Sequence, residues 1–425
     1  MNKVTFRELL RFGFYALRYM FTGGPAYYLW LAFLVALALW GGLAYREQLT
    51  QGLVATNMRD QVSWAFYVGN FTFLVGVAAA AIILIIPAYV YDWKPIKEVA
   101  IMGEILAISA LVMCMLFVLA DLGQPEMVWH MIPSVGKLNF PASLLAWDVV
   151  VLNLYFLLNL VIVVYLLYCT YQQRPYNKYF VVPLILLSIP LAISIHTVTA
   201  FIYNGMAARP FWNASILAPR FLASAMCSGP AILLILFQIL RHTTRFEIKD
   251  EALWKIAEIM AYAMFINLFL QGAEVFKEVY SSSEHVVHFN YLFVGLGHHR
   301  SLVPYGWGAV ICSLLAFGLF IIPATRRHPV TLNLGCLLIY IGVYIEKGMG
   351  LVIPGLTPDA LGEIYEYVPT MTEVRIGVAC FSIGFLVYTF LTKLAVAITL
   401  GDFNRNMVAA GDRRGRPIPR PSTPD

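Results

Sequence analysis

Ten long stretches of hydrophobic residues, separated by shorter polar segments, make up most of the chain. Each stretch reaches or exceeds the roughly 20 residues that an α-helix needs to cross ~30 Å of hydrocarbon. A membrane β-barrel would instead show segments of about ten residues in which polar and apolar positions alternate. The pattern therefore predicts an all-α integral membrane protein with about ten transmembrane helices, at residues 27–46, 63–90, 98–121, 143–169, 179–203, 220–241, 252–280, 303–324, 329–353 and 375–400.

The composition excludes a soluble protein. Of the 425 residues, 60% are hydrophobic and 12% are charged, whereas soluble domains contain about 25% charged residues. The net charge of +5 comes from basic residues spread over several connections. Because they form no single basic stripe, nucleic-acid binding is not indicated, and membrane lipid is the expected surrounding.

Lysine and arginine residues occupy alternate connections between the stretches. They are frequent in the N-terminal arm, in the connections near residues 95, 176, 245 and 326, and in the C-terminal tail, whereas the loop at 355–374 is acidic. Because basic residues mark the inner side, both termini are predicted to be cytoplasmic, in the cytoplasmic membrane. Residues 4–21 are expected to form an amphipathic helix on the inner leaflet. The first twenty residues lack the compact apolar core of a cleavable signal.

The cysteine and histidine pattern bears on cofactors. Six cysteines lie singly in or beside the stretches, and none belongs to a Cys-x-x-Cys pair. Paired histidines for a haem are also missing, since only His196 lies deep within a stretch. We therefore expect no haem, iron–sulfur cluster or metal in this chain. His285, His288, His298 and His299 fall in an outer loop, where solvated histidines are the alternative to a metal site.

Ionisable residues within the stretches gather toward the outer side. Such groups are costly in hydrocarbon and usually mark a substrate, ion or proton site. On the predicted topology the outer set comprises Asp121, Asp148, His196, Glu274, Glu278, Glu346 and Lys347, while Glu104 and Glu258 lie in inner halves. The pattern predicts a polar pocket near the outer face. The glutamates and Lys347 are candidates for proton transfer, with helix packing as the alternative.

His196 and Asp148 are the candidate catalytic residues. A neutral imidazole offers one donor and one acceptor and titrates near neutrality, which suits it to take a proton from a quinol hydroxyl. Asp148 could accept that proton or orient His196. The alternatives are a histidine bonded to a backbone carbonyl and a carboxylate that complements the start of its helix. The outer segment around Arg209, Trp212 and Arg220 is either a membrane-interface anchor or part of a binding surface.

Five segments together resemble the NrfD/PsrC family of quinone-interacting membrane subunits. They are SWAFYVGNFTFLVGVAAAAIILIIPAYV, LADLGQP, SLLAWDVVVLN, HTVTAFIYNGMAARPFWNASILAPRFLASA and YIGVYIEKGMGLVIPGLTPDALGEIYEYVPT. The ten-span form is most similar to the DsrP branch of DsrMKJOP complexes in dissimilatory sulfur metabolism, followed by the HmcC branch of multihaem cytochrome complexes.

The resemblance implies two four-helix bundles flanked by the first and last spans. It divides the chain into an arm (1–26), a first span and loop (27–62), a first bundle (63–203), an outer loop (204–219), a second bundle (220–353), an acidic loop (354–374), a last span (375–401) and a basic Pro-rich tail (402–425).

The resemblance also implies a function. Members bind menaquinone or another quinone near the outer face and exchange electrons with a ferredoxin-like iron–sulfur subunit docked there. The implied partners further include a multihaem cytochrome c, a haem b membrane subunit and a cytoplasmic iron–sulfur subunit. The expected quinone-binding residues are Tyr67, Asn70, Asp121, Tyr203, Arg209, Trp212 and Arg220.

Two other classes of function remain open from the sequence. Ten spans with polar groups at membrane depth also suit a proton-coupled secondary transporter, although no helix breaks are evident at matching positions. A purely structural anchor of a redox complex would tolerate changes at His196 and Asp148.

Overall fold

The computed structural model describes residues 6–132, 135–281 and 285–409, and it contains ten helices long and apolar enough to cross a membrane. This confirms the predicted all-α membrane fold. The spans are α2 (Pro25–Gln51), α3 with α4 (Phe66–Ala78, Ala80–Ile85), α6 (Ala100–Asp121), α7 (Leu144–Tyr171), α8 (Lys178–Asn204), α9 (Leu217–Thr243), α10 (Asp250–Ser281), α12 (Val303–Ile321), α14 with α15 (Pro329–Lys347, Met349–Leu356) and α16 (Met371–Thr399). The described residues form no β-sheet, only an isolated bridge in the loop after residue 293.

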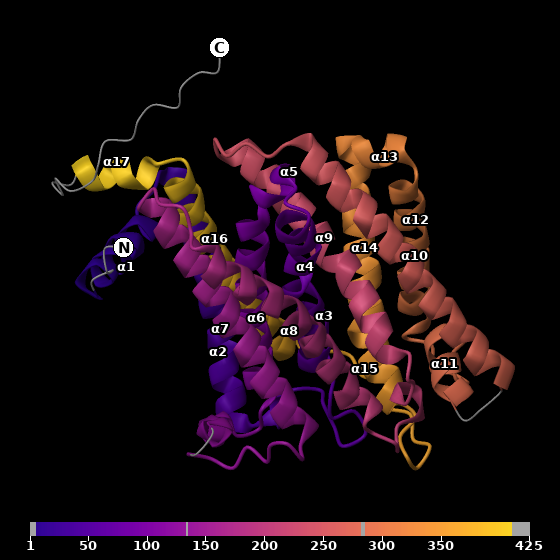
Figure 1. Cartoon of the computed structure of the whole chain (residues 1–425). Coiled ribbons are helices and arrows are strands. Elements are labelled where there is room, and N and C mark those ends of the chain that lie inside the picture. The colour runs from indigo at the N-terminus through magenta and orange to yellow at the C-terminus, as the bar shows by residue number, and fades with distance from the viewer. Residues whose placement is uncertain (1–5, 133–134, 282–284, 410–425) are drawn as a thin grey trace.

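The spans pack as two bundles joined along α9. One bundle is made of α3 and α4 with α6, α7 and α8, and the other of α9, α10, α12 and α14. The α9 helix also packs against α3 and α8, while α2 lies against α16, which in turn packs on α6 (Figure 1). The arrangement is the expected pair of four-helix bundles with the first and last spans at one flank.

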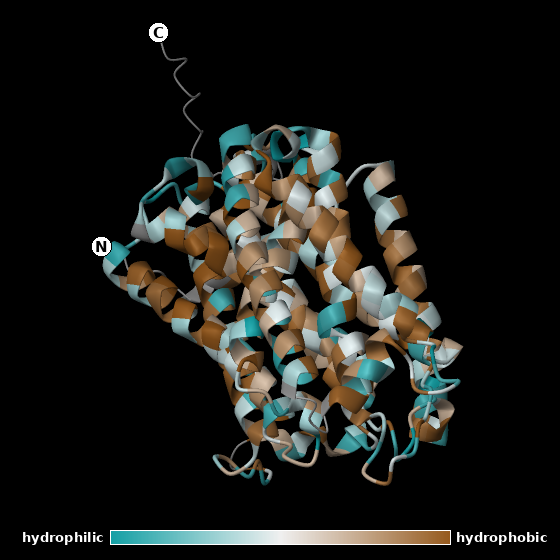
Figure 2. Cartoon of the chain, turned by 90° about the vertical axis from the view of Figure 1, so that its right-hand side faces the viewer, coloured by the Kyte–Doolittle hydropathy of each residue, from teal (hydrophilic) through white to brown (hydrophobic). Residues whose placement is uncertain are grey.

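Burial follows this arrangement. In the central span Phe66–Tyr89, 88% of the residues in its apolar stretch are buried inside the protein. The corresponding share in α2 is 17%. Hydrophobic residues cover the middle of the molecule and polar residues lie toward its two ends (Figure 2). The exposed apolar sides of the outer helices are therefore the surfaces that suit contact with lipid.

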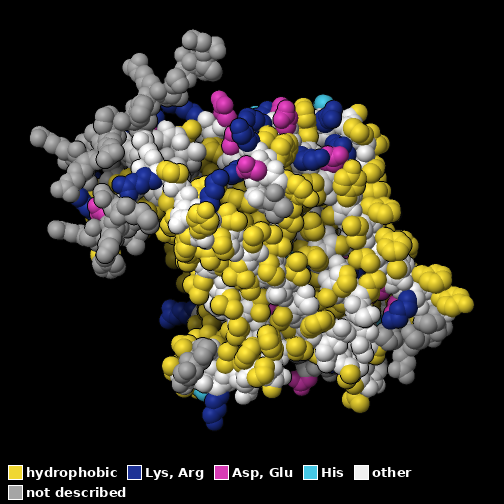
Figure 3. Space-filling view, in the orientation of Figure 1, with side chains coloured by type: hydrophobic (Ala, Val, Ile, Leu, Met, Phe, Trp, Pro, Cys, Tyr) yellow, Lys and Arg dark blue, Asp and Glu magenta, His cyan; other side chains and the backbone are white. Residues whose placement is uncertain are grey.

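Shorter elements distinguish the two ends of the bundles. One end carries α1 (Phe6–Met20), α5 (Lys94–Lys97), α13 (Pro323–Arg327) and α17 (Asp402–Ala409), and we call it the basic end. Charged side chains gather there, above a flank that is mostly hydrophobic (Figure 3). The opposite, loop end is formed by residues 52–65, 122–132, 135–143, 205–216 and 357–370 with η1 (Leu53–Ala55), η3 (Pro125–Met131), η4 (Pro210–Trp212) and α11 (His285–Phe293). That the loop end faces outward stays a prediction, and the tail beyond residue 409 lies outside the described residues.

Two spans expected to be continuous are interrupted. The span 63–90 breaks after α3 at Ala79 and ends in a π-helical turn, η2 (Ile86–Val90), and the span 329–353 breaks at Gly348 between α14 and α15. A Cβ at Gly348 would lie 2.6 Å from the Tyr344 carbonyl oxygen and 3.2 Å from that of Gly69. Glycine is therefore required where α3 and the α14–α15 junction come closest.

A buried carboxylate ties the loop end together. Glu373, at the start of α16, accepts hydrogen bonds from the Thr370 backbone N–H (2.8 Å), the Asn57 backbone N–H (3.0 Å) and the Tyr367 hydroxyl. Burial, with the Glu373 carboxylate nearby, raises the pKa of Tyr367 well above its ordinary value, so the phenol remains a donor. This capping box joins the acidic loop to residues 52–65.

Candidate functional site

His196 and Asp148 belong to one polar cluster in the first bundle. Both side chains are buried, His196 completely. Thr199, one turn after His196 on the same face of α8, places its Oγ1 2.8 Å from Asp148 Oδ1 on α7. The structure thus places His196 one helical turn from Thr199, the hydrogen-bond partner of Asp148, which the sequence reasoning did not single out.

The hydrogen bond of His196 fixes its tautomer. Its Nδ1 lies 2.8 Å from the Ala192 carbonyl oxygen. Because a carbonyl only accepts, Nδ1 carries the proton and Nε2 is left with a lone pair. Nε2 is buried and has no hydrogen-bond partner among the described residues. A buried acceptor without a partner is costly in a helix bundle, so this atom is suited to meet a donor from a bound molecule.

The Thr199 hydroxyl also bears on the proton state of Asp148. Its Oγ1 lies 2.7 Å from the Ile195 carbonyl oxygen as well as 2.8 Å from Asp148 Oδ1. A single hydroxyl proton cannot serve both acceptors at full strength. The hydroxyl is thus shared between the helix carbonyl and Asp148 Oδ1, and the bond that it donates to Asp148 stabilises the carboxylate form. Thr199 therefore helps to keep Asp148 available as a proton acceptor.

Tyr203 and Trp212 close the cluster toward the loop end. The Tyr203 hydroxyl hydrogen-bonds the Thr72 hydroxyl. The ring centroids of Tyr203 and Trp212 are 5.1 Å apart, and Trp64 stacks on Trp212 at 6.1 Å. Trp212 is fully buried and donates to the Leu351 carbonyl oxygen (2.9 Å). As the last residue of η4 it therefore packs into the protein and is not an exposed interface anchor.

The remaining expected quinone-binding residues lie in separate places. Tyr67 donates to Gln48 Oε1 (2.7 Å) on α2, and Asn70 accepts from the Tyr344 hydroxyl (2.9 Å) on α14. Arg209 donates to the Leu356 carbonyl oxygen (3.3 Å). Asp121 Oδ1, at the loop end of α6, is buried without a partner among the described residues.

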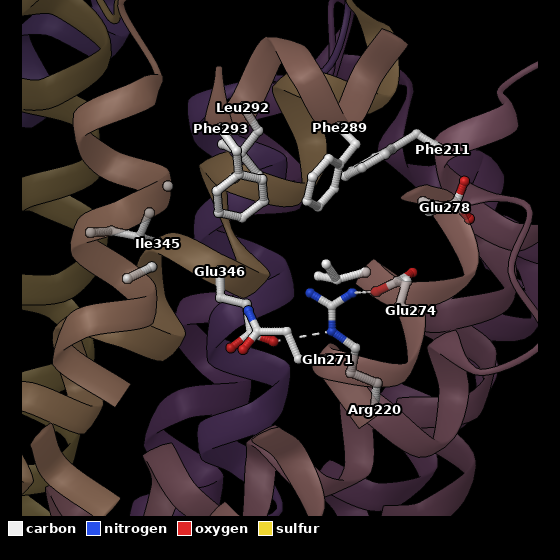
Figure 4. Close-up of a pocket in the computed structure, with 14 residues that line it drawn as sticks. Phe211, Arg220, Gln271, Glu274, Glu278, Phe289, Leu292, Phe293, Ile345 and Glu346 are labelled. Carbon is white, nitrogen blue, oxygen red and sulfur yellow. Dashed lines mark hydrogen bonds and ion pairs between the residues drawn. The ribbon is translucent and has the colours of Figure 1, made fainter. Parts of the chain in front are cut away.

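A second polar cluster lies in the second bundle, around Arg220. Its guanidinium pairs with Glu274 on α10 and donates from Nε to Glu346 Oε1 on α14 (3.1 Å). Asn267 Nδ2 donates to the other oxygen of Glu346 (3.3 Å). Arg220, Glu274 and Glu346 line a pocket whose opposite wall is formed by Phe211, Phe289 and Phe293 (Figure 4). The predicted convergence of outer polar residues thus divides into two clusters, one in each bundle.

Lys347 lies between the two clusters, in the contact of α14 with α9. It is buried, and its Nζ donates to the Phe221 carbonyl oxygen (3.1 Å) and lies 4.5 Å from the centroid of the Phe221 ring. A Cβ at Gly76 on α3 would be 3.1 Å from this Nζ. The lysine therefore packs closely against α3 at Gly76, where a side chain would crowd its Nζ.

The other proton-transfer candidates differ in their surroundings. Glu104 is completely buried on α6, and neither carboxylate oxygen has a partner among the described residues. Glu258 instead lies at the basic end, where it pairs with Lys255 (3.0 Å) and Arg326 (3.7 Å). Glu278 pairs with Lys277 (3.2 Å). Glu278 is buried as well but is paired, so, in the described part of the chain, Glu104 is the one of these three residues with the setting of an unpaired, buried proton carrier.

Comparison with known proteins decides the family. The profile of the family described as polysulphide reductase, NrfD, matches residues 54–358. The chain belongs to the NrfD family. The matched part of this NrfD protein runs from the loop before α3 to the end of α15, so it contains both bundles and leaves the flanking spans α2 and α16 outside.

Across the part of the chain that the structure describes, no group of three His, Cys, Asp or Glu residues could hold a metal ion.

Three relatives of this NrfD protein are named as subunits of reductases or oxidoreductases, two of them as membrane subunits. It is 25% identical to the membrane subunit of a putative dimethyl sulfoxide reductase of Halobacterium salinarum, over 84% of this chain and 88% of the relative. It is 22% identical to a selenate reductase subunit of Mesobacillus selenatarsenatis, over 86% and 93%. The third, an Hdr-like menaquinol oxidoreductase integral membrane subunit of Archaeoglobus fulgidus, is 21% identical over 61% and 62%.

Proposed function

We propose that the chain is the quinone-binding membrane subunit of a respiratory redox complex, which exchanges electrons between menaquinol and an iron–sulfur partner at the loop end. Family membership supports a membrane subunit of a redox complex. The name of the archaeal relative supports menaquinol as the quinone.

The unsatisfied Nε2 of His196 carries the proposal. It is a buried acceptor with a fixed tautomer, one turn from the Thr199 contact to Asp148. A quinol hydroxyl is a donor that is soluble in the membrane and releases its proton on oxidation, so it matches the atom that the bundle leaves without a partner.

The residues account for both protons of the reaction. Oxidation of one quinol to quinone releases two electrons and two protons. One hydroxyl gives its proton to His196 Nε2 and the other to Asp148, while the electrons pass to the partner. The same steps in reverse take menaquinone to menaquinol. Tyr203 and Trp212 would bound the ring from the loop end, and Glu104 would exchange protons toward the basic end.

The finer assignment follows the DsrP-like pattern of the sequence. On this pattern we propose that the chain belongs to a complex of dissimilatory sulfur metabolism. Its other subunits would be a ferredoxin-like iron–sulfur subunit at the loop end, a multihaem cytochrome c, a haem b membrane subunit and a cytoplasmic iron–sulfur subunit. The relatives named for dimethyl sulfoxide and selenate reductases support an oxyanion or sulfur-linked redox chain in general terms.

The test is a reduction assay on the gently solubilised native complex. A reduced menaquinol analogue is added, and co-purifying haem or iron–sulfur centres are followed by visible and EPR spectroscopy. Reduction that a quinol-site inhibitor blocks is the expected result. A chain that purifies without redox partners and without quinone would contradict the proposal and favour the transporter class.

A further inference from the structure

The pocket of the second bundle has the walls of a site for an aromatic ring. Phe211 of η4 and Phe289 and Phe293 of α11 form one side, and Arg220 and Glu274 face them across the space (Figure 4). None of these aromatic side chains belongs to the cluster around His196. Aromatic walls bind planar rings by offset or edge contacts.

The charges around this pocket balance. Three carboxylates and three cations lie in or beside it, and they are Glu274, Glu278, Glu346, Arg220, Lys277 and Lys347. The Arg220 guanidinium already serves two of the carboxylates, and Lys277 serves the third. A site with paired charges gives no net attraction for an ion, so a neutral ligand is the better match.

One polar group in the wall remains available to such a ligand. The half-buried Gln271 amide lines the pocket and makes no hydrogen bond with the described residues. An amide offers both a donor and an acceptor. It can therefore donate to a carbonyl oxygen or accept from a hydroxyl, which are the oxidised and reduced forms of a quinone oxygen.

Exposed aromatic rings lie on the outer faces of two helices that wall the pocket. Phe269 and Phe276 on α10 are 65% and 67% exposed, and Tyr305 on α12 is 59% exposed. These helices form two walls of the pocket and turn apolar rings away from the bundle. In a membrane this surface meets lipid, so the ligand would be one that partitions into the bilayer.

We propose that this pocket is a second quinone-binding site, so that the chain holds one site in each four-helix bundle. The ring would lie against Phe289 and Phe293, with one ring oxygen hydrogen-bonded to Gln271. This goes beyond the proposed function, which requires only the site at His196.

Photolabelling of the native complex tests the second site. The probe is a photoreactive azido-naphthoquinone, and adducts are mapped by mass spectrometry to α7 and α8 or to α10 and α11. We expect adducts in both regions. Phe289→Leu and Gln271→Leu should each weaken labelling of α10 and α11 by roughly two- to tenfold, as loss of one ring contact or one hydrogen bond implies, without changing labelling of α7 and α8. Phe269→Leu, which removes a lipid-facing ring from α10, is the matched control and should change neither.

The outcomes separate the two sites. Adducts confined to α7 and α8, or adducts on α10 and α11 that both variants leave unchanged, would overturn the second site. Responsive adducts on α10 and α11 without any on α7 and α8 would support it and reject the site at His196. Absence of adducts in both regions would overturn both.

Discussion

Replacing Thr199 by valine tests whether Asp148 takes a proton during turnover. Valine keeps the shape of the side chain but removes the oxygen that lies 2.8 Å from Asp148 Oδ1. A hydrogen bond to a charged acceptor contributes about 1.5–3 kcal/mol and a neutral one about 1 kcal/mol. The variant therefore destabilises the carboxylate form more than the protonated form, by about 1 kcal/mol.

The free-energy difference between the two forms of Asp148 predicts the direction in which the pH dependence of quinol oxidation shifts. A less stable carboxylate becomes available as a base only at higher pH, so the acid limb of quinol oxidation should move upward by about one pH unit, since one unit corresponds to ~1.4 kcal/mol. The assay is the pH dependence of menaquinol-driven reduction in the native complex.

Thr197→Val is the control for Thr199→Val. Thr197 also donates to the carbonyl oxygen four residues earlier on α8 (3.0 Å), but it does not contact Asp148. Both variants lose this helix contact, so only the bond to Asp148 distinguishes them. A Thr199→Val profile that coincides with that of Thr197→Val, or that moves to lower pH, would refute the proton-accepting role of Asp148.

Two further changes test the packing of the bundles, and a third tests proton transfer. Arg220→Leu leaves the buried Glu346 and the half-buried Glu274 without their cation and should destabilise the protein by about 3–5 kcal/mol; thermal unfolding in detergent measures this, and an unchanged Tm would contradict the ion cluster. Gly348→Ala should lower the Tm because its Cβ meets the Tyr344 carbonyl oxygen at 2.6 Å, whereas Gly308→Ala meets no atom within 4 Å and should not; equal effects would reject the close packing at the α14–α15 junction. Glu104→Gln should preserve assembly but slow proton uptake measured with a pH dye during quinone reduction, and an unchanged uptake rate would remove Glu104 from the path.

The spans and the depth of their polar residues could be predicted because they depend on local sequence. An apolar stretch long enough to cross the membrane defines a helix wherever it packs. The break at Gly348 could not be predicted in this way, because hydrophobicity along the span does not reveal where α3 approaches it at Gly69.

The composition of each cluster depended on tertiary contacts. The cost of a polar group in hydrocarbon identifies both His196 and Asp148, but Thr199, the partner of Asp148, resembles an ordinary helix threonine until α7 is placed beside α8. Closeness in sequence groups Arg220 with Trp212. The structure separates them, since Arg220 faces α10 and α14 while Trp212, at the end of η4, packs against α15.

The most direct test of the proposed site is single-turnover reduction of the partner centres by menaquinol in a His196→Ala complex. Loss of a general base typically costs a factor of 10²–10⁴, so reduction should slow by at least about a hundredfold while the subunits remain assembled and Thr197→Val stays at the rate of the unaltered complex. A fully assembled His196→Ala complex that is reduced at the unaltered rate would contradict the account.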